Sequence, residues 1–191
     1  MKKIIFLFSF LTLITLNTVS SFAQETLPLN QATVSADSNT SKSVEYELPY
    51  PGILPDHPLY FLKMTRDWIV RLLISDLLKK AEFDLLQADK RLNSGLYLLH
   101  NDKDKNAELA QSTISKGEDY FEEAIKNAEK AKKQGMDTKD VLRRLLDSSK
   151  KHQEILQSLG SKSTEALKDD YFHLQERAEG FERAVSSLSA E

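Results

Sequence analysis

Cysteine is absent from the 191-residue chain, and glycine and proline are scarce, with six and five residues respectively. Without cysteine the chain has no disulfide, no thiolate nucleophile, no Cys-ligated metal and no iron–sulfur cluster. The sequence also contains neither a phosphate-binding glycine-rich loop nor the Gly-x-Ser-x-Gly pattern of hydrolase nucleophiles. These absences predict a protein without enzymatic activity and without catalytic, cofactor-binding or metal-binding residues.

The chain also has no excess of basic residues. It contains 26 Lys and Arg residues and 29 Asp and Glu residues, which gives a formal net charge of -3. Nucleic-acid binding depends on clustered positive charge, so no nucleic-acid partner is expected. Loss of residues 1–23, which contain two lysines and no acidic residue, would change the formal charge from -3 to -5.

The N-terminus has the three parts of a secretory signal peptide. Lys2 and Lys3 form a basic region, an apolar run extends from Ile4 to Leu16, and the small residues at positions 21 and 23 suit a signal peptidase. We therefore expect a signal peptide over residues 1–23, cleaved after Ala23, and a secreted or periplasmic (extracytoplasmic) protein. An uncleaved N-terminal anchor is the alternative. No later apolar run reaches membrane-spanning length, so no membrane contact is expected after cleavage.

Residues 24–47 are rich in Ser, Thr, Asn, Gln and Ala and show no apolar period. Such a segment cannot bury enough apolar surface to offset the entropy lost on ordering. We therefore expect a disordered polar tether over 24–47 and a helical domain over 48–191.

The domain begins with a proline-rich segment, which we interpret as a clamp on the start of the bundle. Pro51 and Gly52 suit the central positions of a type II turn, and a trans peptide bond is expected before Pro51. The apolar pair Ile53 and Leu54 is expected to dock on the domain. Asp56 or His57 is expected to cap a helix that has Pro58 in its first turn.

The first predicted helix, residues 58–74, has an unusually wide apolar arc. Lys63, Asp67 and Arg71 follow one another at i,i+4 and are expected to pair along one exposed edge. A helix that is apolar on most sides is usually buried on most sides, so we expect it to be the central helix of the domain. Ser75 and Asp76 predict a break after it.

Four further helices are expected, up to about residue 100, over 107–134, over about 137–160, and from a Ser161 cap to the end. Gly135 and Gly160 are interpreted as helix stops, and residues 101–106 as a charged loop. The 3-4 spaced seams of these helices are Leu78, Ala81, Leu85, Ala88, Leu92, Gly95 or Leu96, Leu99; Ala107, Ala110, Ile114, Gly117, Phe121, Ala124, Ala128, Ala131; Val141, Leu145, Ser148, His152, Ile155, Leu159; and Leu167, Tyr171, Leu174, Ala178, Phe181, Val185, Leu188. They predict an all-α antiparallel bundle of four to five helices, or a long coiled-coil hairpin.

The proline-rich segment and the next helix resemble a family of exported bacterial and archaeal proteins catalogued as a domain of unknown function. The matching positions are Pro51, Gly52, Pro55, Asp56, Pro58 and Tyr60, then Lys80, Ala81, Glu82, Arg91 and Leu92. The resemblance covers about residues 48–159, and Leu77 departs from it where the family often has proline. It implies an exported helical domain and no established activity.

The four histidines offer few metal ligands, because they are far apart and form no His-Glu-x-x-His or Glu-x-x-His pattern. Asp170 and His173 come nearest to a ligand pair but are expected on a solvated face. His152 lies on a helix seam, which is typical of a satisfied bundle histidine. His57 and His100 stand far from the other two histidines in the sequence.

Residues Asp102, Asp104 and Asn106 resemble the start of a calcium loop. Ala107 and Thr113 replace the glycine and the glutamate that such a loop requires at its sixth and twelfth positions. A helix-capping loop is therefore expected. The adjacent carboxylates Glu122 and Glu123 carry no burial signal that would favour acid–base catalysis, and are expected on a solvated face.

Two non-enzymatic functions compete. The first is a structural or protein-interaction module of the cell envelope, which binds an envelope protein through a helix face. The second is a membrane-surface or chaperone-like protein, suggested by Phe61, Lys63, Arg66, Trp68 and Arg71. Interfacial helices usually have a strongly cationic polar face, and the intervening Asp67 favours core packing instead. A periplasmic metal-binding bundle is a further alternative, and the oligomeric state is left open.

Overall fold

The computed structural model describes residues 44–190, apart from the side chain of Asp104, and every regular element in this range is an α-helix. The helices are α2 (Tyr60–Leu73), α3 (Leu77–Asn101), α4 (Lys103–Lys133), α5 (Lys139–Lys162) and α6 (Glu165–Ala190). The predicted all-α class is confirmed. The predicted signal peptide, and the predicted tether up to residue 43, lie outside the described residues.

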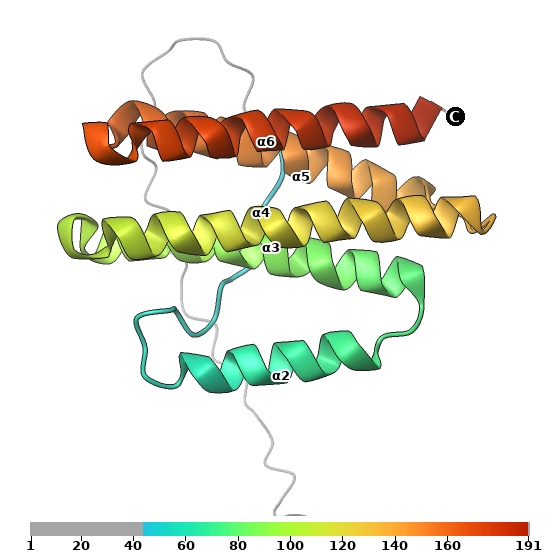
Figure 1. The fold of residues 1–191 in the computed structure, drawn as a ribbon, viewed down its shortest axis with the longest axis horizontal. Coiled ribbons are helices and arrows are strands. Elements are labelled where there is room, and N and C mark those ends of the chain that lie inside the picture. The colour runs from blue at the N-terminus through green and yellow to red at the C-terminus, as the bar shows by residue number, and fades with distance from the viewer. Residues whose placement is uncertain (1–43, 191) are drawn as a thin grey trace, which may run out of the picture. The chain divides into compact units, whose positions relative to one another are not determined.

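Helices α3 to α6 form an up-and-down bundle in which each helix runs opposite to the one before it (Figure 1). The closest packing joins α3 to α4 and α5 to α6, and α4 also packs along α6. The two helix pairs are thus packed together as a bundle, and the alternative of a long coiled-coil hairpin is wrong. Helix α2 lies outside this bundle, with its backbone closest to α3 (Figure 1). Within residues 44–190, none of the helices has the length and apolar content that crossing a membrane requires.

The predicted seams are the buried stripes of the bundle. Fully buried positions include Leu85 and Leu92 on α3, Ile114 and Phe121 on α4, Leu145 on α5 and Val185 on α6. The rings of Phe121 and Phe181 stack with their centroids 5.0 Å apart. A Cβ atom on Gly95 would lie 2.5 Å from Ile114 Cγ1, so the small residues on α3 and α4 let these helices approach closely.

Three predicted helix boundaries within the bundle are wrong: the loop over 101–106, the stop at Gly160 and the Ser161 cap, since Ser161 lies inside α5 and α6 begins at Glu165. Asp102 is the single residue between α3 and α4, and its Oδ1 accepts a hydrogen bond from the Lys105 backbone N–H at 3.1 Å, so no loop extends over 101–106. Gly160 lies inside α5, which continues to Lys162, because Gly160 does not take the positive φ of a helix stop. Gly135 does take it, with φ 76°, directly after α4 and confirms the predicted stop.

The chain before α2 runs along the bundle and holds to it by hydrogen bonds. The Val44 N–H donates to Glu154 Oε2 on α5 at 3.1 Å, and the Tyr46 hydroxyl donates to Asp89 Oδ2 on α3 at 2.6 Å. The Asn93 side chain donates to the Pro49 carbonyl at 2.9 Å. Residues 44–47 therefore belong to the clamp, and their assignment to the tether is wrong.

The turn before α2 fits the prediction only in part. Gly52 has φ 73°, as the second central position of a type II turn requires, and the described peptide bonds contain no cis bond. Pro51 is fully buried, whereas Ile53 is 41% exposed, so the predicted docking of Ile53 is wrong. Helix α2 begins at Tyr60, two residues later than predicted, and His57 Nδ1 accepts from the Leu59 N–H at 3.1 Å.

Candidate functional site

Helix α2 turns its polar side chains toward the bundle and its apolar side chains toward solvent. Asp67 is buried and Lys63 and Arg71 are half-buried, whereas Trp68 is 64% exposed and Leu72 69% exposed. The prediction of a buried central helix is therefore wrong. The physical reason is that the buried apolar residues of α3 to α6 pack against one another, and α2 contributes no apolar residue to this core.

The C-terminal half of α2 is fastened by an ion pair whose carboxylate is buried. Arg71 Nε and Nη2 donate to Asp84 Oδ1 and Oδ2 at 2.6 and 3.1 Å, and Asn127 Nδ2 donates to Asp84 Oδ2 at 3.0 Å. Burial raises the pKa of the Asp84 carboxyl, and the hydrogen bonds from Arg71 and Asn127 oppose that shift. A bidentate guanidinium–carboxylate pair is both strong and directional, so it fixes α2 on α3 and α4.

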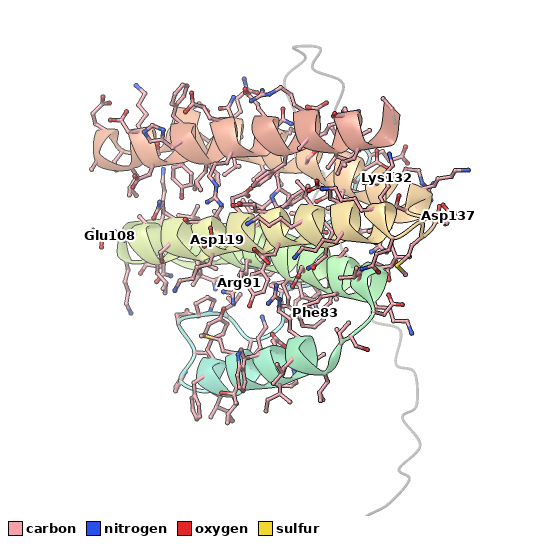
Figure 2. All side chains as sticks on the ribbon, turned by 45° about the vertical axis from the view of Figure 1, so that its right-hand side comes forward. Phe83, Arg91, Glu108, Asp119, Lys132 and Asp137 are labelled. Carbon is pink, nitrogen blue, oxygen red and sulfur yellow. The ribbon has the colours of Figure 1, made fainter. Side chains whose placement is uncertain are left out.

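The N-terminal half is fastened by aromatic and carbonyl contacts. Arg91 Nη1 donates to the Tyr60 hydroxyl at 3.1 Å, and the same guanidinium lies 5.0 Å from the centroid of the Tyr120 ring. Figure 2 shows Arg91 on the side of α3 that faces α2. Lys63 Nζ donates to the Pro51 carbonyl at 2.7 Å, and its desolvation lowers the pKa of this lysine. Tyr60 and Arg91 belong to two separate parts of the family pattern that the sequence resembles, and the structure brings them into contact.

The predicted edge of Lys63, Asp67 and Arg71 is wrong, because each of these side chains has a different partner. Arg66 Nη2 lies 2.6 Å from Asp67 Oδ1, which pairs the only largely exposed cation of α2 with an adjacent carboxylate. The charged side chains of α2 therefore either make contacts on the side that faces the bundle or pair with each other.

The opposite side of α2, which we call the α2 outer face, consists of exposed apolar residues: Leu59, Phe61, Leu62, Met64, Trp68, Ile69, Val70, Leu72 and Leu73. At ~200 Å² for an aromatic side chain, Phe61 and Trp68, 61% and 64% exposed, contribute on the order of 250 Å². With the other apolar side chains of the face, the exposed apolar area exceeds ~300–600 Å², the area of the largest apolar patch on a typical monomer. A patch of this size is typical of interaction surfaces.

A second group of polar residues, the interior cluster, consists of Asp89, Glu118, Ser148 and His152, which are buried in the bundle, and of the half-buried Tyr46. His152 Nδ1 lies 2.8 Å from Glu118 Oε1, and His152 Nε2 lies 3.1 Å from Asp89 Oδ1. The Ser148 hydroxyl donates to Asp89 Oδ1 at 2.6 Å. Both ring nitrogens of His152 thus have partners, which confirms the interpretation as a satisfied bundle histidine.

The interior cluster carries charge at neutral pH. Burial lowers the pKa of His152, but the field of Glu118 and the hydrogen bonds to Asp89 and Glu118 outweigh it and raise this pKa to about 9. Burial, together with the nearby Asp89 carboxylate, raises the pKa of Tyr46. An imidazolium therefore lies between two carboxylates, while Glu118 Oε2 is buried without a hydrogen-bond partner.

The interior cluster lacks the arrangement of a nucleophile and its base. The Ser148 proton points to Asp89 rather than to His152, and His152 has no exposed surface. The cluster therefore ties α3, α4, α5 and the N-terminal segment together. Asp89 and Glu118 were not among the residues predicted from the sequence, although each directly follows a seam position. A buried seam histidine requires such partners.

The remaining histidines are exposed. His173 Nδ1 pairs with Glu176 at 3.3 Å, and His57 bonds the backbone before α2. His100 and Asp170 also lie at the surface. Within the part of the chain that the structure describes, no group of three or more His, Asp and Glu residues is arranged to hold a metal ion.

The calcium-like segment acts as a helix cap. Asp102 caps α4, and the buried Asn106 side chain donates to the Leu98 carbonyl at 3.2 Å. These contacts confirm the capping interpretation. Glu122 and Glu123 are half-exposed and pair with Lys126 at 2.9 and 3.2 Å, as expected for a solvated helix face.

The fold and the site define a class: an all-α bundle that carries one helix on its outside with an exposed apolar face. Residues 52–166 match the family described as Domain of unknown function (DUF5667), so the chain belongs to that family. Neither the curated proteins nor the solved structures gave a match. The predicted resemblance to a family of unknown function is confirmed, while export and the correspondence of individual motif residues stay predictions.

Proposed function

We propose that this chain is a non-enzymatic protein-interaction module of the cell envelope and that it binds its partner through the α2 outer face. The observation that carries the proposal is the inverted placement of α2, whose polar side is fastened to the bundle while Trp68 and Leu72 remain in water. Burying exposed apolar area is the main driving force of protein association.

The composition of the face supports a protein partner. Aromatic residues and methionine are enriched in protein interfaces, and Phe61, Met64 and Trp68 all lie on it. The ion pair between Arg71 and Asp84 holds α2 in place before binding, so the partner meets a surface that is already ordered.

A membrane-surface role is the second candidate, favoured by the exposure of Phe61 and Trp68 on one side of a helix. Interfacial helices combine such a side with free cations at its margins. Here Lys63 and Arg71 turn inward and Arg66 pairs with Asp67, which favours the protein partner over lipid.

Site-specific photo-crosslinking in cells tests the proposal. A benzophenone amino acid at Leu72 of the full chain should give a discrete protein adduct, and the added change Ile69→Asp should abolish it. The control position is Phe172 on α6, which is 56% exposed and lies outside the α2 outer face. Equal adducts from both positions, or none from position 72, would contradict the proposal.

Liposome flotation tests the second candidate. Vesicles of neutral and anionic phospholipid should leave the full chain at the bottom of the gradient at physiological salt. Binding that Ile69→Asp removes, while Phe172→Asp does not, would favour the membrane-surface role.

A further inference from the structure

We infer that the partner of the α2 outer face is the same face of a second copy of this chain, so that the protein is a two-fold symmetric dimer. The inference rests on the proposed function and names its partner. In such an isologous contact, one self-complementary patch serves both copies.

The size of the face matches what a stable dimer buries. A standard interface removes ~800 Å² from each partner. The α2 outer face has nine large apolar side chains, each between 38% and 76% exposed, of which Leu72 and Leu73 are the most exposed. A surface of this area and continuity in water would otherwise drive non-specific association.

The scarcity of charged side chains on the α2 outer face favours a partner surface that is itself apolar. Charged residues are depleted at the core of interfaces, most of all in homodimers. The α2 outer face largely meets this condition, because Lys63, Asp67 and Arg71 lie on the inner side. Arg66, which lies one turn from both Leu62 and Val70, is paired with Asp67. The chain's net charge of -3 also gives no attraction to an anionic lipid surface.

The position of α2 leaves room for a second copy. Helix α2 lies at the edge of the bundle, and no other helix of residues 44–190 lies on its far side (Figure 1). Leu62, Ile69 and Leu72 of the α2 outer face and the polar Thr65 between them follow a 3-4-3 spacing along one side of the helix, and all four are exposed. In an antiparallel pair of α2 helices, Leu62 meets Leu72 of the other copy and Thr65 meets Ile69, which gives mixed layers of large and smaller side chains.

Sedimentation of the full chain tests the inference, with the only tryptophan as an internal reporter. From about 1 to about 100 µM chain, the mass should rise from one copy to two. The emission of Trp68 should shift to the blue with the same midpoint, because its exposed indole becomes buried.

Matched variants give the test its specificity. Ile69→Asp should raise the dimer dissociation constant by roughly 100-fold or more, as loss of an interface core residue does. Phe172→Asp, at an exposed aromatic residue on α6, should leave the dissociation constant unchanged. Leu62→Asp serves as a second variant, and circular dichroism should show unchanged helicity for all of them.

The inference and the proposed function fail in different ways. A chain that stays monomeric at every concentration, while position 72 still crosslinks to another protein, would overturn the dimer and keep the proposed function. A monomer whose Trp68 emission is blue at the lowest concentration would mean that the chain covers α2 by itself, and would overturn both. A dimer that Ile69→Asp does not weaken would overturn the inference.

Discussion

The bundle of α3 to α6 and the helix α2 place polar and apolar side chains in opposite ways. Inside the bundle, His152 is fully buried among apolar residues, and carboxylates on α3 and α4 satisfy both of its nitrogens. On α2, the apolar Trp68 and Leu72 lie in water, and the polar Arg71 makes the contact with the bundle.

The difference shows that the hydrophobic core is built by α3 to α6, without an apolar residue of α2. Helix α2 is then held by directional contacts, chiefly the bidentate pair of Arg71 and Asp84. A helix attached through its polar side leaves its apolar side exposed. The contrast predicts large effects for changes inside the bundle and small effects for changes on the α2 outer face.

The largest effect is expected for His152→Leu. Without the imidazolium, Asp89 and Glu118 remain buried and uncompensated, and breaking a buried ion pair costs about 3–5 kcal/mol. Urea unfolding followed by circular dichroism measures this loss. His173→Leu, at an exposed histidine, is the control and should change the free energy of unfolding by less than about 0.5 kcal/mol. Equal stability of the two variants would mean that the interior cluster contributes nothing.

The pH dependence of stability follows from the same histidine. Its pKa is raised from 6.5 to about 9 by folding, so the folded chain holds a proton that the unfolded chain has lost. The contribution of His152 is therefore fully present below about pH 6.5 and is lost as the pH rises through about 9. Urea unfolding at a series of pH values should show this decline, and His152→Gln should flatten it. A parent profile that is already flat between pH 7 and 9 would rule out a charged His152.

A smaller and local effect is expected for Arg71→Met. The change removes both hydrogen bonds to Asp84 and leaves this carboxylate with Asn127 alone, at a cost of about 1–3 kcal/mol. Hydrogen exchange should become faster in α2 and stay slow in α3 to α6. Arg143→Met, at an exposed arginine of α5, is the control. Faster exchange throughout the bundle would mean that α2 is an integral part of the core.

The smallest effect on stability is expected for Leu72→Ala. The parent side chain is 69% exposed, so its removal should change the free energy of unfolding by less than about 0.5 kcal/mol. Leu85→Ala, at a fully buried leucine of α3, should cost about 2–5 kcal/mol. Measurements at low protein concentration keep association out of the comparison. A cost for Leu72→Ala close to that for Leu85→Ala would show that the α2 outer face is covered within one chain.

The sequence by itself determined the four seams of the bundle, because 3-4 periodicity decides which side chains a helix can bury. It also determined the stop at Gly135, where a positive φ favours glycine. The tertiary structure decided which side of α2 faces the bundle. A wide apolar arc indicates that a helix needs an apolar contact. It does not indicate whether the same chain or another molecule provides that contact. The partners of His152 likewise depended on how α3, α4 and α5 meet, since Asp89 and Glu118 lie far from it in the chain and converge only when the helices pack.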